Sequence, residues 1–254
     1  MFSTCRVRHG VHFYKVWFAK EPFKKSGIIA YYQASFKDSR VQVNNYDTIV
    51  NDLTPAPEEI KAQFSKSCKY KVNRAAREDV QLTIKDSKDI TDKDIDEFLK
   101  FFKEFWESKD VEFNNSTSVR QDLVEYRAGN NLTLAYAVVC GEKAIYHTHV
   151  YDDTTARLLH SASLYRLQGD AEGTNKNLIG MANRYMHYEE MLHFKQMGKS
   201  VYDWGGAGRG EDVINITEFK ESFGGELKQD YNFEVTNGIV ARIFRIVARL
   251  CKKS

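Results

Sequence analysis

Hydrophobic residues along this chain recur with two periods, every second residue in some segments and every third or fourth in others. The first period is typical of strands and the second of helices. The segments expected to form strands are residues 11–19, 27–34, 40–43, 80–84, 132–139, 143–151, 156–165, 200–204 and 225–235. The segments expected to form helices are residues 58–77, 91–105, 119–128, 177–197, 216–223 and 238–251. Residues 51–57 hold two of the three prolines and are expected to be a linker.

The order of these segments predicts a mixed α/β fold of the α+β kind, with a mainly antiparallel central sheet flanked by helices. The segments 132–139, 143–151 and 156–165 follow one another across short turns, which predicts an antiparallel meander. The helix at 177–197 leads directly into the strand at 200–204, which predicts a helix-connected parallel step. We expect a single domain over residues 1–254.

Composition narrows the classes of function. A net charge of +2 over 254 residues argues against a general nucleic-acid coat. The four cysteines form no C-x-x-C pair, which argues against a cysteine zinc site or a disulfide framework and favours a cytosolic protein. No apolar run of about 18 residues and no secretory signal is recognised, so no spanning helix is expected.

The most informative stretch, residues 202–206, reads as a strand that ends in an acid and two glycines. Ligands of α/β sheets bind outside the carboxyl ends of strands, and paired glycines let a ligand approach the backbone closely. Asp203, Trp204, Gly205 and Gly206 are therefore candidate site residues. The alternative is a tight turn that carries a surface acid.

A short helix then presents one lysine between two phenylalanines and stops at two glycines. Lys220 is a candidate for binding a phosphate or stabilising an oxyanion as it forms. Phe219 and Phe223 are candidates for packing against a substrate. The alternative is a surface lysine whose stem lies along the aromatic rings.

The helix at 58–77 has a basic face, on which Lys71, Arg74 and Arg77 lie at helical spacing. Such a face could clamp a phosphate or pyrophosphate, because the arginine fork binds phosphate oxygens in pairs. The alternative is a solvated face without a ligand.

Three histidines fall on neighbouring predicted strands. His147 and His149 share one face of their strand because they are two residues apart, and His160 lies on the next strand. They could supply a general base, or they could be polar filling of the core. With no acid at matched spacing, we expect no metal site.

The polar loop before the helix at 177–197 could bind an anion. Gly169 and Gly173 lie in this loop, and Asn175 or Asn177 could cap the helix, where free backbone N–H groups attract negative charge. These four residues are candidates for cofactor binding, although the loop matches no Walker or dinucleotide motif.

Four segments together resemble the FemAB-like branch of the GNAT acyltransferase superfamily, which includes enzymes that build peptidoglycan bridges. They are KYKVNRAAREDVQLTI, YEEMLHFKQMGKSVYDWGG, ITEFKESFGGE and the meander between them, and they cover residues 58–236. The most specific part is YDWGG followed by FKESFGGE. Full family members have two GNAT-like halves. This chain matches about one module, with residues 1–57 as a reduced N-terminal portion and residues 237–254 as a basic amphipathic helix.

The resemblance implies an N-acyltransferase that moves an acyl group from an activated donor to an amine. It implies that Lys220 lies near the reacting carbonyl, and that the basic helix meets the phosphates of the acceptor. Asp203, His147 and His149 stay open as the base. The expected donor is an acyl-CoA, above all acetyl-CoA, with no tightly bound cofactor and no metal.

The resemblance also implies an acceptor, an amine-bearing sugar nucleotide or lipid-linked glycan of cell-envelope polysaccharide biosynthesis, met in the cytoplasm. One alternative is an aminoacyltransferase of the peptidoglycan-bridge type that depends on aminoacyl-tRNA. Another is a GNAT-like module that binds a ligand without catalysis.

The last predicted helix combines an apolar stripe with basic residues. The stripe holds Ile239, Val240, Ile243, Phe244, Ile246, Val247 and Leu250, and the basic residues are Arg242, Arg245, Arg249, Lys252 and Lys253. This pattern is typical of an interfacial helix, so residues 239–253 are a candidate for peripheral contact with the inner face of a membrane. The alternative is a helix packed on its own sheet with a basic outer face.

Overall fold

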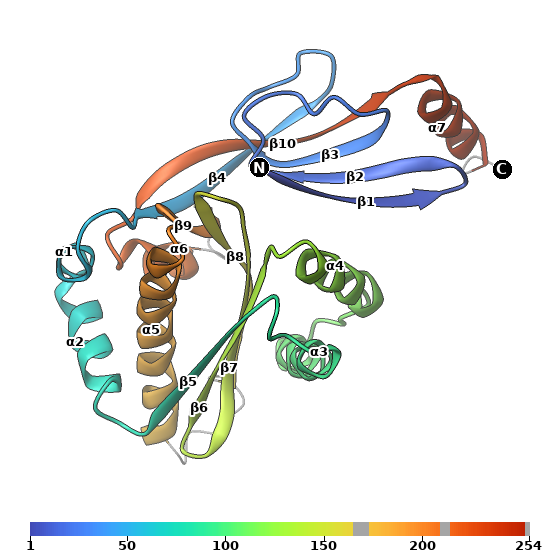
Figure 1. Ribbon diagram of the computed structural model, residues 1–254. Helices are drawn as coiled ribbons and strands as arrows, with labels where there is room; N and C mark the ends of the chain where they lie inside the picture. The colour runs from blue at the N-terminus through green and yellow to red at the C-terminus, as the bar shows by residue number, and fades with distance from the viewer. Residues whose placement is uncertain (165–172, 209–213, 252–254) are drawn as a thin grey trace. The chain divides into compact units, whose positions relative to one another are not determined.

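The computed structural model describes residues 1–164, 173–208 and 214–251 (Figure 1). Contacts along the chain group into two compact units. One comprises residues 1–48 and 227–254, and the other comprises residues 49–226. The expectation of a single domain stays a prediction.

The first unit is a sheet with one helix. Its strand order is β1-β2-β3-β10-β4, with β2 and β3 parallel and the β1–β2 and β3–β10 pairs antiparallel. The elements are β1 (Phe2–Arg8), β2 (Val11–Trp17), β3 (Gly27–Ala34), β10 (Glu226–Asn237), the first part of β4 (Val43–Asp52) and α7 (Ile239–Cys251). Its core is largely aromatic and β-branched, built around Val16, Ile29, Tyr31, Phe233 and Val235.

The second unit is a larger sheet with helices on both faces. Its strand order is β4-β9-β8-β7-β6-β5. The strands are β5 (Val80–Asp86), β6 (Leu132–Val139), β7 (Glu142–Tyr151), β8 (Thr155–Ser163) and β9 (Val201–Gly206). The helices are α1 (Pro57–Ala62), α2 (Lys66–Ala75), α3 (Asp92–Glu107), α4 (Ser116–Ala128), α5 (Gly173–Gln196) and α6 (Ile214–Glu221).

The two helical layers of the second unit explain the burial of its central strand. Figure 1 shows α2 and α5 on one face of the β5–β8 region, and α3 and α4 on the other. β7 is consequently buried at every position from Ala144 to Tyr151. Side chains on one face of β7 therefore meet α5, and those on the opposite face meet α3.

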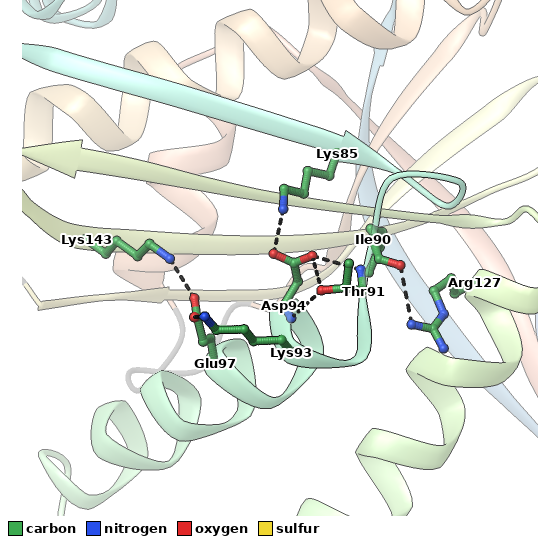
Figure 2. Close-up of polar contacts among 8 residues, drawn as sticks. All are labelled: Lys85, Ile90, Thr91, Lys93, Asp94, Glu97, Arg127 and Lys143. Carbon is green, nitrogen blue, oxygen red and sulfur yellow. Dashed lines mark hydrogen bonds and ion pairs between the residues drawn. The ribbon is translucent and has the colours of Figure 1, made fainter.

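The start of α3 shows how local sequence fixes one element (Figure 2). Thr91 and Asp94 form a reciprocal capping box, in which Asp94 Oδ2 accepts from the Thr91 amide at 2.8 Å and Thr91 Oγ1 accepts from the Asp94 amide at 3.2 Å. Lys85 Nζ on β5 lies 2.6 Å from Asp94 Oδ1, and Lys143 Nζ on β7 lies 2.6 Å from Glu97 Oε2. The helix is thereby tied to the sheet at its N-terminal end.

The observed elements confirm the predicted fold class. The sheets are mixed and mainly antiparallel, the meander β6-β7-β8 is antiparallel, and β8 and β9 pair in parallel. All the helices of the described residues are too short or too polar to cross a membrane.

The prediction was wrong at β4. A strand was expected at residues 40–43 and a linker at 51–57, whereas β4 runs from Val43 to Asp52. Its first half is polar and partly exposed, with Asn44, Asn45 and Asp47, so no hydrophobic alternation marks it. Pairing with its neighbours in the sheet makes this segment a strand. β1 was missed for a similar reason, since its residues are exposed or half-buried throughout.

The single helix expected over residues 58–77 is in fact two helices, α1 and α2, separated at residues 63–65. Ser65 starts the second, because its Oγ accepts from the Cys68 amide at 3.2 Å and its own amide donates to the Ser222 carbonyl at 2.8 Å. Gly224 has φ +73°, and a Cβ there would lie 2.4 Å from the Gln63 carbonyl oxygen. The end of α6 therefore packs against the break between α1 and α2. This close approach requires glycine at position 224.

Candidate functional site

The structure brings the two most informative sequence motifs together. Lys220, near the end of α6, directs its Nζ at the end of β9 and donates to the carbonyl oxygens of Gly205 at 3.2 Å and Gly206 at 2.5 Å. The strand end and the short helix thus form one structural feature.

Lys220 is a buried cation held at neutral carbonyls. Its side chain is buried, and the pKa of Lys220 is lowered to about 8. Burial is the main cause, repulsion from Arg157 adds to it, and attraction to Asp203 opposes it. An ammonium group carries three donors, and the two carbonyls use two of them. The third can therefore serve a negatively charged oxygen of a ligand.

Asp203 shapes the turn that Lys220 meets. Its carboxylate is buried and accepts from the Gly205 amide at 2.8 Å. Gly205 has φ +69°, and a Cβ there would lie 3.0 Å from the Leu158 carbonyl oxygen and 3.3 Å from an Arg157 nitrogen. Asp203 therefore holds the tight turn at Gly205, and its role as a base stays a prediction.

The aromatic residues of the two motifs form a wall behind Lys220. Trp204 and Phe223 are fully buried, with ring centroids 4.6 Å apart. Trp204 Nε1 donates to Asn51 Oδ1 at 2.7 Å, and Asn51 Nδ2 donates to the Phe223 carbonyl at 2.8 Å. Phe219 is only half-buried. The rings of Trp204 and Phe223 both lie in the core. The substrate contacts expected for them stay a prediction.

Sequence reasoning missed Arg184, a residue that covers this wall. Its guanidinium lies 4.5 Å from the centre of the Phe219 ring, and its Nη1 donates to the Gly180 carbonyl at 3.1 Å. This geometry is a cation–π contact. The helical spacing of Arg184, His187 and Glu190 on α5, three residues apart, was the available signal.

Behind the aromatic wall lies a fully buried polar network centred on Glu190. His147 Nδ1 lies 2.8 Å from Glu190 Oε1, and Tyr202 donates its hydroxyl proton to Glu190 Oε2 at 3.1 Å. His187 Nδ1 and His149 Nε2 lie 2.9 and 3.1 Å from the Tyr202 hydroxyl. The predicted pairing of His147 and His149 on one face is thus observed, and α5 supplies the acid that the sequence analysis did not find.

The network surrounds one fully buried carboxylate, that of Glu190. Burial opposes ionisation of Glu190, but the neighbouring histidines and their hydrogen bonds keep its pKa well below the ordinary value. Burial lowers the pKa of His149 to about 4 and that of His187 to about 3. Burial and the Glu190 charge raise the pKa of Tyr202. Most polar atoms of these side chains pair within the network, whereas the buried His149 Nδ1 has no hydrogen-bond partner among the described residues. The roles of His147 and His149 as a base stay predictions.

His147, His187 and Glu190 also offer three ligand atoms within 4.8 Å of one another, as a metal site would. The His147 and His187 rings, however, stack with centroids 4.3 Å apart and planes inclined by only 23°. A ring nitrogen directs its lone pair in the plane of its ring, so two stacked rings cannot both direct theirs at one ion. The geometry fits shared protons rather than a shared ion. The expectation of no metal stays a prediction.

His160 lies away from this network. Its Nδ1 is 2.8 Å from Thr148 Oγ1, and its ring packs 5.1 Å from Phe102 on α3. Burial lowers the pKa of His160 to about 4. It therefore belongs to the face of the sheet that α3 covers.

The basic helix is only partly available for a ligand. Lys71 is half-buried, and Arg74 is exposed with its guanidinium near Tyr70 Oη at 3.4 Å and Glu78 Oε1 at 3.5 Å. A hollow of about 370 Å³ lies on this surface. It is lined by Tyr70, Asn73, Arg74, Arg77 and Glu78. The phosphate clamp stays a prediction.

The candidate cofactor loop is described only at its end. Gly169 lies outside the described residues. α5 begins at Gly173, four residues before the predicted start, so Asn175 and Asn177 lie inside its first turns. The expectation that one of them caps the helix is therefore wrong for this helix start, whereas cofactor binding by these residues stays a prediction.

The fold is similar to several solved structures. No family model matches the chain, and no curated protein sequence matches it. FemX has a TM-score of 0.58 at 11% identity, with 74% of this chain and 61% of FemX covered. The C-terminal domain of a lysylphosphatidylglycerol synthetase from Agrobacterium fabrum has a TM-score of 0.55 at 14% identity, with 88% and 72% covered. L-PGS from Bacillus licheniformis has a TM-score of 0.52 at 12% identity, with 88% and 73% covered.

These likenesses confirm the predicted resemblance to the FemAB-like branch at the level of the fold. The identities are all below those at which activity follows from likeness, and this chain spans 61% of the length of FemX. Reaction, donor and acceptor therefore do not follow from the fold alone.

Proposed function

We propose that this chain is an acyltransferase that moves an acyl group from an activated ester or thioester donor to an amine. The observation that carries the proposal is the buried Lys220 ammonium at the end of β9, beside the paired glycines. The fold shared with FemX and with the lysylphosphatidylglycerol synthetase domain supports it.

The proposed chemistry needs little beyond alignment and charge stabilisation. The amine nitrogen attacks the carbonyl carbon, the new C–N bond forms, and the carbonyl oxygen becomes negative. The C–O or C–S bond to the donor then breaks, and the leaving group takes up the proton that the amine loses. Lys220, ionised below its pKa of about 8, would stabilise the negative oxygen through its third N–H. Gly206, which is exposed at the strand end, has no side chain that would block the approach of the carbonyl.

Different observations favour two donors. The sequence resemblance favours an acyl-CoA such as acetyl-CoA. The fold likeness to a lysylphosphatidylglycerol synthetase favours an aminoacyl ester, since that name denotes a lysyl group joined to a phospholipid. We place the aminoacyl ester, carried on tRNA, first and acyl-CoA second.

For the acceptor we propose an amine of a sugar nucleotide or lipid-linked glycan used in cell-envelope biosynthesis, met in the cytoplasm. The basic face of α2 supports this proposal, because Lys71 and Arg74 carry positive charge that phosphate groups of such an acceptor would meet. Arg74 is exposed and Lys71 is half-buried, so Arg74 is the better placed of the two to contact a phosphate group.

A matched pair of lysines tests the proposal. Lys195 on α5 also donates to two carbonyls, those of Leu53 at 2.8 Å and Thr54 at 3.0 Å, but lies away from the strand end. We expect Lys220→Ala to lower the single-turnover rate of acyl transfer by about a hundredfold or more, and Lys195→Ala to change it less than about threefold. Equal effects would show that Lys220 is only structural.

Ligand-induced stabilisation tests the donor separately from catalysis. A ligand that binds the folded state raises the midpoint of thermal unfolding. We expect a rise with charged tRNA, and a smaller rise or none with uncharged tRNA. A rise with acetyl-CoA alone would assign the donor to coenzyme A. Binding of either donor without transfer to any amine would support the non-catalytic module.

A further inference from the structure

The last helix of the first unit presents an apolar face to solvent. Ile239, Val240, Ile243, Ile246 and Val247 are between 52% and 76% exposed. Four of them follow the spacing i, i+4, i+7, i+8, which places them on one side of α7. Soluble proteins expose large aliphatic side chains singly, so a row of five on one helix indicates a surface that binds something.

α7 packs on its sheet through other residues. Ala241 is buried against Val11 of β2 and Ile28 of β3, and the Phe244 ring meets the edge of Phe13 at 5.6 Å. Most of the apolar stripe that the sequence analysis identified therefore points outward. Over residues 239–247, where the side chains are described, the outer face is mainly aliphatic and not mainly basic.

The surroundings of this face carry positive charge. Arg242 is exposed on α7, and Lys24 and Lys25 are exposed in a loop that contacts the start of the helix, where Asn237 Nδ2 donates to the Lys25 carbonyl at 3.4 Å. Residues 238–254 contain five basic and no acidic side chains. Among the acids packed near α7, Glu234 is paired with Arg245.

We propose that α7 binds the surface of an anionic lipid bilayer, lying in the plane of the headgroups with its aliphatic face toward the acyl chains. A helix of 13 residues is too short to span a bilayer, whereas aliphatic residues flanked by arginine and lysine suit the interface. Anionic headgroups complement this charge. A second copy of the chain would bring the same arginines together, so the charge favours lipid over a dimer. The proposal does not depend on the acyl transfer proposed above.

Flotation with vesicles tests the proposal on the whole chain. We expect the protein to float with vesicles of phosphatidylcholine and phosphatidylglycerol, and to bind vesicles of phosphatidylcholine alone at least tenfold more weakly. Ile243→Asp should weaken binding at least tenfold, and Arg242→Gln about fivefold, with the remaining binding falling further as salt is raised.

Leu227→Asp is the matched control, since Leu227 is 61% exposed in the same unit but lies on β10. It should bind vesicles as the parent does, and circular dichroism should show all three variants folded. The proposal is overturned if the parent stays unbound with anionic vesicles, or if Leu227→Asp weakens binding as much as Ile243→Asp. A parent that is dimeric by light scattering, with Ile243→Asp monomeric, would overturn it in favour of a second copy.

Discussion

Lysines in the second unit lie in two kinds of environment, one beside carboxylates and one beside backbone carbonyl oxygens. At the start of α3, Lys85 and Lys143 each lie 2.6 Å from a carboxylate, of Asp94 and Glu97 (Figure 2). The hydrogen bond to Asp94 raises the pKa of Lys85. At the end of β9, Lys220 meets carbonyl oxygens instead, and burial lowers its pKa to about 8.

The contrast shows which lysine does not contribute to the stability of the fold. A lysine beside a carboxylate is stabilised in its charged form, and its position follows from charge pairing. A lysine buried against neutral carbonyls costs the folded state free energy as long as it stays charged. Lys220 is therefore the better candidate for function, because folding alone does not favour it at this position.

Loss of the buried Glu190 charge should destabilise the fold more than any other change considered below. Glu190→Gln replaces a carboxylate that accepts from Tyr202 and contacts three histidines. We expect the free energy of unfolding to fall by about 3 kcal/mol, because the change breaks a buried charged network. Urea denaturation measures it. Glu189→Gln, at the neighbouring half-buried position, should cost less than about 0.5 kcal/mol.

The pH dependence of transfer comes next and tests the charge of Lys220 directly. If the ammonium stabilises the oxyanion, the single-turnover rate should fall about tenfold per pH unit above the pKa of about 8. A profile measured on both sides of this pKa decides. A rate that rises through the same range would make the neutral side chain of Lys220 the active form. It would contradict the assignment of the Lys220 ammonium as the group that stabilises the oxyanion.

Paired substitutions test the stability side of the comparison. Lys85→Met removes the ion-pair partner of Asp94 and should lower the free energy of unfolding by about 1 kcal/mol. Lys220→Met removes a buried charge and should leave stability unchanged or raise it, even though two hydrogen bonds are lost. A larger loss for Lys220→Met than for Lys85→Met would reverse the comparison.

The contributions of Lys220 and Lys85 to stability should change with pH in opposite directions. The folded pKa of Lys220, about 8, lies below its ordinary value of 10.5, so the unfolded chain binds more protons between these limits. The contribution of Lys220 to stability therefore rises with pH in this window. Lys85, with a raised pKa, contributes stability at lower pH that is lost as pH rises through its folded pKa. Denaturation curves of the parent and both methionine variants separate the two contributions.

A weaker effect is expected from the helix cap at the start of α3 alone. Thr91→Ala removes the oxygen that caps the Asp94 amide and should lower the free energy of unfolding by about 1 kcal/mol or somewhat less. Thr91→Ser keeps the hydroxyl and should recover most of the loss. If serine fails to recover stability, the methyl group of Thr91, and not its hydroxyl, is what stabilises the start of α3.

Sequence patterns were reliable where one segment contains its own signal. The meander β6-β7-β8, the cap at Thr91 and the strand end at Gly205-Gly206 were predicted because alternation, capping residues and glycines act over a few positions. The polar strand β4 and the break between α1 and α2 were not predicted, because the strands next to β4 and the contact between Ser65 and Ser222 come from segments distant in sequence.

The site divides in the same way. The amino-acid sequence alone marked Lys220 and the glycines of β9 as candidates for chemistry, and it placed an apolar stripe beside basic residues on α7. The packing of distant segments was needed to show that Lys220 is buried at those glycines, that Trp204 lies in the core, and that α5 supplies Glu190 to the histidines. It also decided that the stripe of α7 faces outward. Burial and pKa depend on which distant segments pack together, and a local pattern does not contain that information.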